Sequence, residues 1–375
     1  MVSRRQTLSN GPLHRQQGAA LLVLLTIVVL AASYSLLKRL NREQPDIVRA
    51  GDNAAVLGEA KAALIGYALS SNARPGELPC PDYGIGPGGL DGLSDACDEN
   101  GMYVTIGRLP WKTLGLPDLR DAGGESLWYA PDINLDGNFQ INSETSTNLR
   151  VVTNNTVQIA AVVIAPGKVT STQSRPQNVA AQTTPARYLE ASNAVADPNI
   201  SVVAPTVTAE FTDQVLVITR DELIEPVERR VLAELKQALD NFGGLPSPAG
   251  NGGVVCNSTP LSQGLLPVTT DATCGTLPAW PTWFSDTTTG WQPLIWYAMD
   301  PLKTITVQDG ATSINSVESL LIAAGPIITG IGQIQATPRV LSSLLDTAIN
   351  NDGLDLAFET LPISPMTNDQ LLIVR

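Results

Sequence analysis

The chain is poor in the side chains on which most enzymes depend. It has 375 residues but a single histidine, His14, which lies close to the beginning of the sequence. Ser-His-Asp triads, Cys-His pairs and His-ligated zinc are therefore excluded from the rest of the chain. A hydrolase would instead need a pair of carboxylates, and the sequence does not locate one. These absences favour a protein that is not an enzyme.

Positive charge is scarce as well. Lys and Arg number 23 against 36 Asp and Glu, which gives a net charge of −13, and only 16% of the residues are charged. Phosphate groups are bound by clustered Lys and Arg, so nucleic acid is not an expected partner. The hydrophobic fraction of 43% is enough to build buried cores. At about 150 residues per domain, the length allows two or three domains.

One long run without charge stands out, from Ala19 to Leu37. A helix that rises about 1.5 Å per residue over such a run can cross a hydrocarbon core of about 30 Å. We therefore expect a transmembrane helix and its extension at 19–50, after a polar and basic leader at 1–18. Three alternatives stay open for this region: a leader cut before the run, a secretory signal cut near Ala32, and an uncleaved anchor.

The junction between leader and apolar run carries a family resemblance. The residues Gln16-Gln17-Gly18-Ala19-Ala20 resemble the cleavage site of prepilins, where a dedicated peptidase cuts after a glycine. The chain thus resembles type IV pilin-like proteins and minor pseudopilins. The resemblance implies cleavage between Gly18 and Ala19 and methylation of the new N-terminus. It also implies partners: the prepilin peptidase, other pilin or pseudopilin subunits, and the inner membrane.

Val23 departs from the usual pattern of that family. Most pilins carry a glutamate at this fifth position of the mature chain, and it is thought to pair with the terminal amine of a neighbouring subunit. Minor subunits that cap a filament lack this glutamate. The resemblance therefore implies a tip or assembly-priming subunit. The alternative is that Val23 is one more apolar residue of a membrane helix.

An internal repeat follows the apolar run. Five pairs of segments recur in the same order: EAKAALIGY and ELKQALDNF, the two LP…WYA stretches, VVIAPG and LLIAAG, TTPAR and ATPRV, FTDQVLVI and MTNDQLLIV. The sequence therefore predicts two homologous units at 51–219 and 220–375. The expected fold class is α+β, with a long N-terminal transmembrane and amphipathic helix followed by two pilin-like units of a helix and an antiparallel sheet.

The second unit is expected to open with its own helix, directly after the strand-like segment QVLVIT. Asp221 can cap this helix at its N-terminus. An apolar stripe at helical spacing then follows, formed by Val227, Val231, Leu235 and Leu239. We expect this stripe to lie on the sheet of the second unit.

The four cysteines repeat with the units. Cys80 and Cys97 are 17 positions apart, and Cys256 and Cys274 are 18 apart. An even number placed this way behind a membrane-targeting segment predicts two local disulfides in an oxidising compartment. The expected location is therefore the inner membrane, with a single pass and a periplasmic C-terminal head that can enter a filament. Zinc is the competing interpretation, but no CxxC spacing supports it.

A calcium site is the one cofactor that the sequence suggests. Asp132, Asn134 and Asp136 alternate as oxygen ligands do in a calcium loop, and Gly137 can close the turn. The twelfth position is Ser143 in place of the usual glutamate, so the segment is not a regular EF-hand. An ordinary turn rich in Asp and Asn is the alternative.

Taken together, these patterns predict a minor pilin or pseudopilin of a type IV pilus or a type II secretion filament. This prediction depends mainly on the junction at Gly18, and the expected position of the subunit is the tip of the filament or its priming complex. The alternative is a membrane-tethered periplasmic adhesin or carbohydrate-binding protein.

Overall fold

The computed structural model describes most of the chain after residue 50. The described residues are 29, 32–33, 50–84, 89–99, 102–136, 141–151, 157–171, 173–176, 182–194, 201–202, 211–250, 253–256, 262–270, 275–285, 290–328, 333, 344–351, 355–364 and 366–375. The chain divides into two units, 1–54 and 55–375. Gly18, Ala19 and Val23 lie outside the described residues, as does most of the apolar run.

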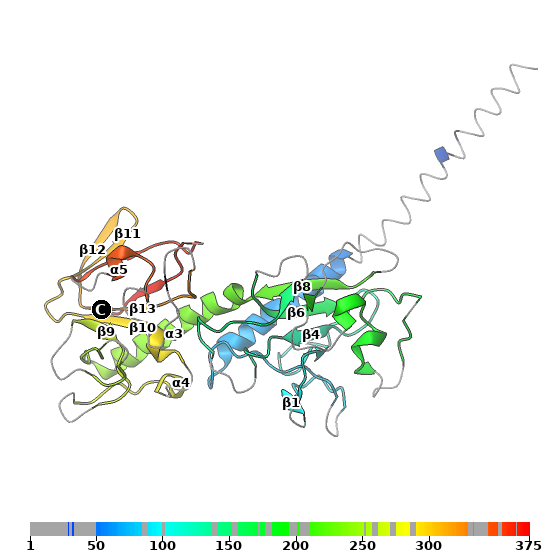
Figure 1. Ribbon diagram of the computed structural model, residues 1–375, viewed down its shortest axis with the longest axis horizontal. Helices are drawn as coiled ribbons and strands as arrows, with labels where there is room; N and C mark the ends of the chain where they lie inside the picture. The colour runs from blue at the N-terminus through cyan, green and yellow to red at the C-terminus, as the bar shows by residue number, and fades with distance from the viewer. Residues whose placement is uncertain are drawn as a thin grey trace, which may run out of the picture. The chain divides into compact units, whose positions relative to one another are not determined.

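The first sheet is antiparallel and four-stranded, in the order β3-β4-β6-β8. Strands β4, β6 and β8 are labelled in Figure 1. Its strands are β3 (Gly107–Arg108), β4 (Trp128–Pro131), β6 (Ile159–Ala165) and β8 (Gln214–Thr219). A helix at 50–70 packs in the core on one face of this sheet through side chains at three- and four-residue spacing: Leu57, Ala60, Leu64 and Ala68. This spacing places the four side chains on one side of the helix.

The second sheet repeats this arrangement with strands later in the chain. Its order is β15-β13-β10-β9, again antiparallel. The strands are β9 (Gln263–Leu265), β10 (Ile295–Met299), β13 (Ser319–Ala323) and β15 (Gln370–Ile373). In each sheet, strands that are neighbours therefore follow one another in the order in which the chain forms the strands of that sheet.

Helix α3 (Arg220–Phe242) follows β8 directly and serves both sheets. Leu223 and Ile224 join the core of the first sheet, whereas Val227 and the rest of the apolar stripe join the core of the second. The N-cap is Thr219, whose side chain accepts from the backbone N–H of Glu222. The expectation that Asp221 caps the helix is therefore wrong, because the capping box begins two residues earlier.

Both faces of each sheet are covered. In β4, Trp128 and Ala130 point to one core and Tyr129 to the other, as the two-residue period of a strand requires. The first sheet's second face packs on loop residues that include Tyr188 and Leu189. The second sheet's equivalent face belongs to a core shared with a three-stranded sheet of β12 (Thr312–Val317), β11 (Ile305–Asp309) and β14 (Ala357–Thr360).

The remaining elements are short. They are β1 (Asp98–Glu99), β2 (Met102–Tyr103), β5 (Arg150–Val151), β7 (Ser201–Val202), α4 (Thr282–Ser285), α5 (Ala348–Asn351) and the 3-10 turns η1 (Pro185–Arg187), η2 (Ala191–Ala194) and η3 (Gln292–Leu294).

The expected fold class, with a long N-terminal transmembrane helix ahead of two pilin-like units, is wrong. The described structure mixes α and β and consists mostly of sheets, and none of its helices is long and apolar enough to cross a membrane. The reason is charge: the helix at 50–70 carries Asp52, Glu59 and Lys61, and α3 carries acidic and basic residues along its whole length.

The expected location is corrected by the same finding. A single-pass protein of the inner membrane requires a helix that spans the bilayer, and the described part of the chain contains no such helix. The segment for which the spanning role was expected lies outside the described residues, except at Val29, Ala32 and Ser33.

Candidate functional site

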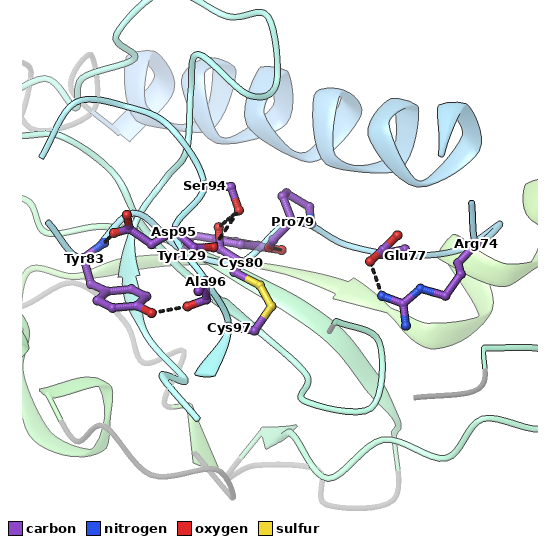
Figure 2. The surroundings of a disulfide bond; sticks show 10 residues. All are labelled: Arg74, Glu77, Pro79, Cys80, Tyr83, Ser94, Asp95, Ala96, Cys97 and Tyr129. Atoms are coloured by element: carbon purple, nitrogen blue, oxygen red, sulfur yellow. Dashed lines mark hydrogen bonds and ion pairs between the residues drawn. A yellow bond between two sulfur atoms is a disulfide. The ribbon is translucent and has the colours of Figure 1, made fainter. Parts of the chain in front are cut away.

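Cys80 and Cys97 form a disulfide whose Cα atoms are 5.1 Å apart. Figure 2 shows the polar contacts that hold the loop between them. The hydroxyl of Tyr83 donates to the carbonyl of Ala96, and the hydroxyl of Ser94 donates to the carbonyl of Cys80 at 2.9 Å. The loop is thus fixed by hydrogen bonds between its own residues as well as by the covalent bond.

The second pair of cysteines is described only in part. Cys256 is buried and disulfide-bonded. Cys274, its expected partner, lies outside the described residues. The pairing in the second unit therefore stays a prediction.

Asp132, the first of the three expected calcium ligands, holds the loop that follows β4. Its carboxylate accepts from the backbone N–H groups of Asn134, Asn148 and Leu149. It is 2% exposed, and burial raises its pKa. The side-chain amide of Asn134 donates to the carbonyl of Ser146 at 2.8 Å. These contacts bring two chain segments together, and the calcium site stays a prediction.

Asp136 differs from its two neighbours in the motif. It is 1% exposed, and neither carboxylate oxygen has a hydrogen-bond partner among the described residues. Burial, and then the charge of Asp132, raise the pKa of Asp136 to about 7. Its carboxylate lies beside the sulfur atoms of Cys80 and Cys97. The sequence motif placed Asp136 on a turn but gave no sign of this disulfide neighbour.

A polar cavity of about 420 Å³ lies beside the first sheet. Such a volume suits a small ligand. Its lining includes three guanidinium groups, three carboxyl groups and two aromatic rings that lie far apart in the sequence: Arg108, Arg120, Arg175, Asp82, Asp118, Glu125, Trp111 and Tyr188. Hydrogen-bond donors and acceptors therefore face the same space.

Arg108 forms one wall of the cavity. Its guanidinium lies 4.1 Å from the ring centre of Trp128 and 4.3 Å from that of Tyr188. It donates to the carbonyls of Ser126 and Gln182. Burial lowers the pKa of Arg108 to about 10, so the group keeps its charge at neutral pH. The two rings stabilise that buried charge through their faces.

Arg175 also lies over the ring of Tyr188, with its guanidinium 5.6 Å from the ring centre. Its terminal nitrogens donate to the carbonyls of Gly167, Pro166 and Tyr188, and its side chain is 6% exposed. The Nε–H group has no partner among the described residues. The nearest ion pair, with Glu125, is long at 3.6 Å. Arg175 lines the cavity, but this buried Nε–H group does not face its open space.

Asp82 supplies a titratable group to the same cavity. Its carboxylate accepts from the backbone N–H groups of Gly84 and Gly92. Burial raises the pKa of Asp82 to about 6, although the two hydrogen bonds act in the opposite direction. The charge of the cavity therefore becomes more negative as the pH rises through about 6.

The structure also brings together a carboxyl pair that the sequence did not locate. Asp213 accepts from the backbone N–H of Glu190, and Glu190 accepts from that of Asp213. Both side chains are buried, and burial together with Glu190 raises the pKa of Asp213. The pair does not line the cavity beside Arg108 and Arg175, nor the smaller ones beside Glu228 and Asn350. We therefore assign it to holding the loop before β8.

No family model, curated protein or solved structure matches the chain. The function must therefore be argued from the residues themselves. Arg108 and Arg175 were not predicted from the sequence, because the fold brings them to one cavity from distant segments, strand β3 and the loop that follows β6. The one available signal was the aromatic and charged segment that runs from Gly107 to Trp111.

Proposed function

We propose that the chain is a non-enzymatic minor subunit of a pilin-like filament, either a type IV pilus or a type II secretion pseudopilus. Its partners are other pilin or pseudopilin subunits and the prepilin peptidase. The position is the tip of the filament or its priming complex, as the resemblance at Gly18 and the apolar Val23 imply.

The observation that carries this proposal is the paired head. Two four-stranded antiparallel sheets have the same strand order, and a helix that precedes the strands in the chain packs on one face of each. A head with two such modules is too large to repeat along a thin filament. A terminal position removes this steric conflict.

The N-terminus of the protein in its own cells tests the proposal. Mass spectrometry is expected to find a mature chain that begins at Ala19 with a methylated amine. A chain that begins near Ser33 would show that an ordinary signal was removed, and would contradict the pilin-type function. Co-expression with and without a prepilin peptidase provides the matched control.

A second candidate function is supported by the polar cavity. Arginine, carboxyl and aromatic side chains that converge on a space of about 420 Å³ are suited to a sugar, whose hydroxyls both donate and accept. The chain would then be an adhesin or carbohydrate-binding protein. Saturation-transfer NMR with a panel of mono- and disaccharides tests this candidate.

Two variants sharpen the sugar experiment. Arg175→Ala is expected to reduce binding at least tenfold, because it removes one of the guanidinium groups that line the cavity. Arg229→Ala is the control, since this arginine is exposed on α3 and pairs with Glu225. Absence of binding across the panel, or equal binding by both variants, would contradict the carbohydrate-binding function.

A further inference from the structure

Asp136 is a buried acidic group, and no described contact compensates for the cost of burying its carboxylate. Both of its oxygens lack a hydrogen-bond partner among the described residues, and the side chain is 1% exposed. An isolated carboxylate in a protein interior is costly unless a cation or a donor is supplied. The other two residues of its motif are occupied with loop contacts, through the backbone amides around Asp132 and the carbonyl of Ser146.

Two sulfur atoms lie close to the carboxylate of Asp136. A carboxylate oxygen of Asp136 and the Sγ atoms of Cys80 and Cys97 all lie within 4.8 Å of one another. In a tetrahedral zinc site, zinc–sulfur distances of about 2.3 Å place two sulfurs about 3.8 Å apart. Two cysteines with Cα atoms 5.1 Å apart reach this separation by side-chain rotation once the covalent bond is broken.

We propose that Cys80, Cys97 and Asp136 form a binding site for zinc or a similar divalent metal ion when the disulfide is reduced. In the oxidised protein the two sulfurs are bonded to each other and the site is closed. The carboxylate is already in place, because it is buried against the disulfide.

Opening the site requires a dithiol or phosphine reductant. A dithiol transfers two electrons and two protons to the disulfide: the Cys80–Cys97 bond breaks, two thiols form, and the reductant becomes a disulfide. A phosphine gives the same two thiols with one water molecule, which supplies the two protons and the oxygen of the phosphine oxide that forms. Zinc then binds the two sulfurs and displaces both thiol protons to solvent. If Asp136 is protonated, its proton leaves in the same step, so binding releases two or three protons per metal ion.

The ligand set selects the class of metal. Thiolates favour zinc and copper(I), whereas calcium and magnesium take oxygen ligands. Three protein ligands leave one position for water, as in tetrahedral sites with three side chains. The metal would also supply the positive charge that the Asp136 carboxylate lacks.

Cobalt(II) titration of the purified full chain, without a histidine tag, tests the proposal. The background variant Cys256→Ser/Cys274→Ser removes the other thiols, so only Cys80 and Cys97 contribute. After phosphine reduction we expect one cobalt per chain, with thiolate-to-cobalt absorption that zinc abolishes. The oxidised chain is expected to bind none.

Two further variants distinguish Asp136 as a metal ligand from other carboxylates near it. Asp136→Asn is expected to weaken cobalt binding at least tenfold, and Glu77→Gln, which removes a nearby carboxylate paired with Arg74, is expected to leave it unchanged. Equal binding by oxidised and reduced protein, or an unaffected Asp136→Asn variant, would overturn the proposal. Circular dichroism controls the fold: a reduced chain that unfolds and binds no cobalt also overturns it.

Discussion

Trp128 and Trp296 occupy the same position in two different sheets. Trp128 of β4 pairs with Ile164, and Trp296 of β10 pairs with Ile322, each across an antiparallel ladder. The next residue in each strand, a tyrosine, points to the core that contains a helix. This shared register supports the proposed internal repeat at 51–219 and 220–375, because a slip of one residue would exchange the faces.

The two tyrosines provide a matched pair of variants. The buried hydroxyl of Tyr129 donates to the carbonyl of Pro79 at 3.0 Å, whereas the hydroxyl of Tyr297 has no partner among the described residues. Tyr129→Phe is expected to lower the free energy of unfolding by about 1 kcal/mol, and Tyr297→Phe to leave it unchanged or raise it. Urea unfolding measures both. Equal losses of unfolding free energy in the two variants would contradict this prediction.

Glu228 predicts a dependence of stability on pH. It is 2% exposed in α3, and burial raises its pKa well above the ordinary value. Below the pKa of the unfolded chain both states hold the proton; at higher pH only the folded state does, so stability falls as the pH rises through the window between the two pKa values.

Glu228→Gln removes that titration. Its free energy of unfolding is expected to decrease less than that of the wild type as the pH rises above about 4.5. The glutamine can still accept from the side-chain amide of Gln370. Glu225→Gln, in the preceding turn and paired with Arg229 at the surface, is the control. Parallel pH profiles for wild type and Glu228→Gln would contradict the prediction.

Asp132 distinguishes a loop anchor from a calcium ligand. Asp132→Ala leaves the buried N–H of Leu149 without its acceptor and removes two further hydrogen bonds. We expect it to lower the free energy of unfolding by about 2 to 3 kcal/mol in buffer that contains a chelator. Thermal unfolding with and without millimolar calcium completes the test. A loss seen only in the presence of calcium would favour the cation role that the sequence predicts.

The repeated segments predicted more of the fold than the amino-acid composition did. The WYA and VVIAPG segments and their counterparts coincide with paired strands, because a short continuous apolar run suits a strand that is buried on both faces. The cysteine spacing pointed to a local bond, and Cys80–Cys97 is present. The helix cap was missed by two residues, since Thr219 and Asp221 are both good N-cap residues.

The sequence could not predict which side chains come together in the candidate sites, for a physical reason. Arg108 on β3 and Arg175 in the loop after β6 line the same cavity, and no periodic sequence pattern predicts that they approach each other. The approach of Asp136 to the disulfide likewise depends on how one loop folds across another. The expected membrane location rested on the apolar run and on the paired cysteines, and no helix in the described part of the chain is long and apolar enough to span a bilayer.

The position of the chain in a filament tests the central proposal most directly. Gold labelling of a tagged chain, viewed by electron microscopy on filaments from its own cells, locates each copy. We predict labels at filament ends, with deletion of the chain reducing the number of filaments rather than their thickness. Labels spread at high copy along the shaft would contradict the terminal position, and filaments that never carry a label would contradict the filament function itself.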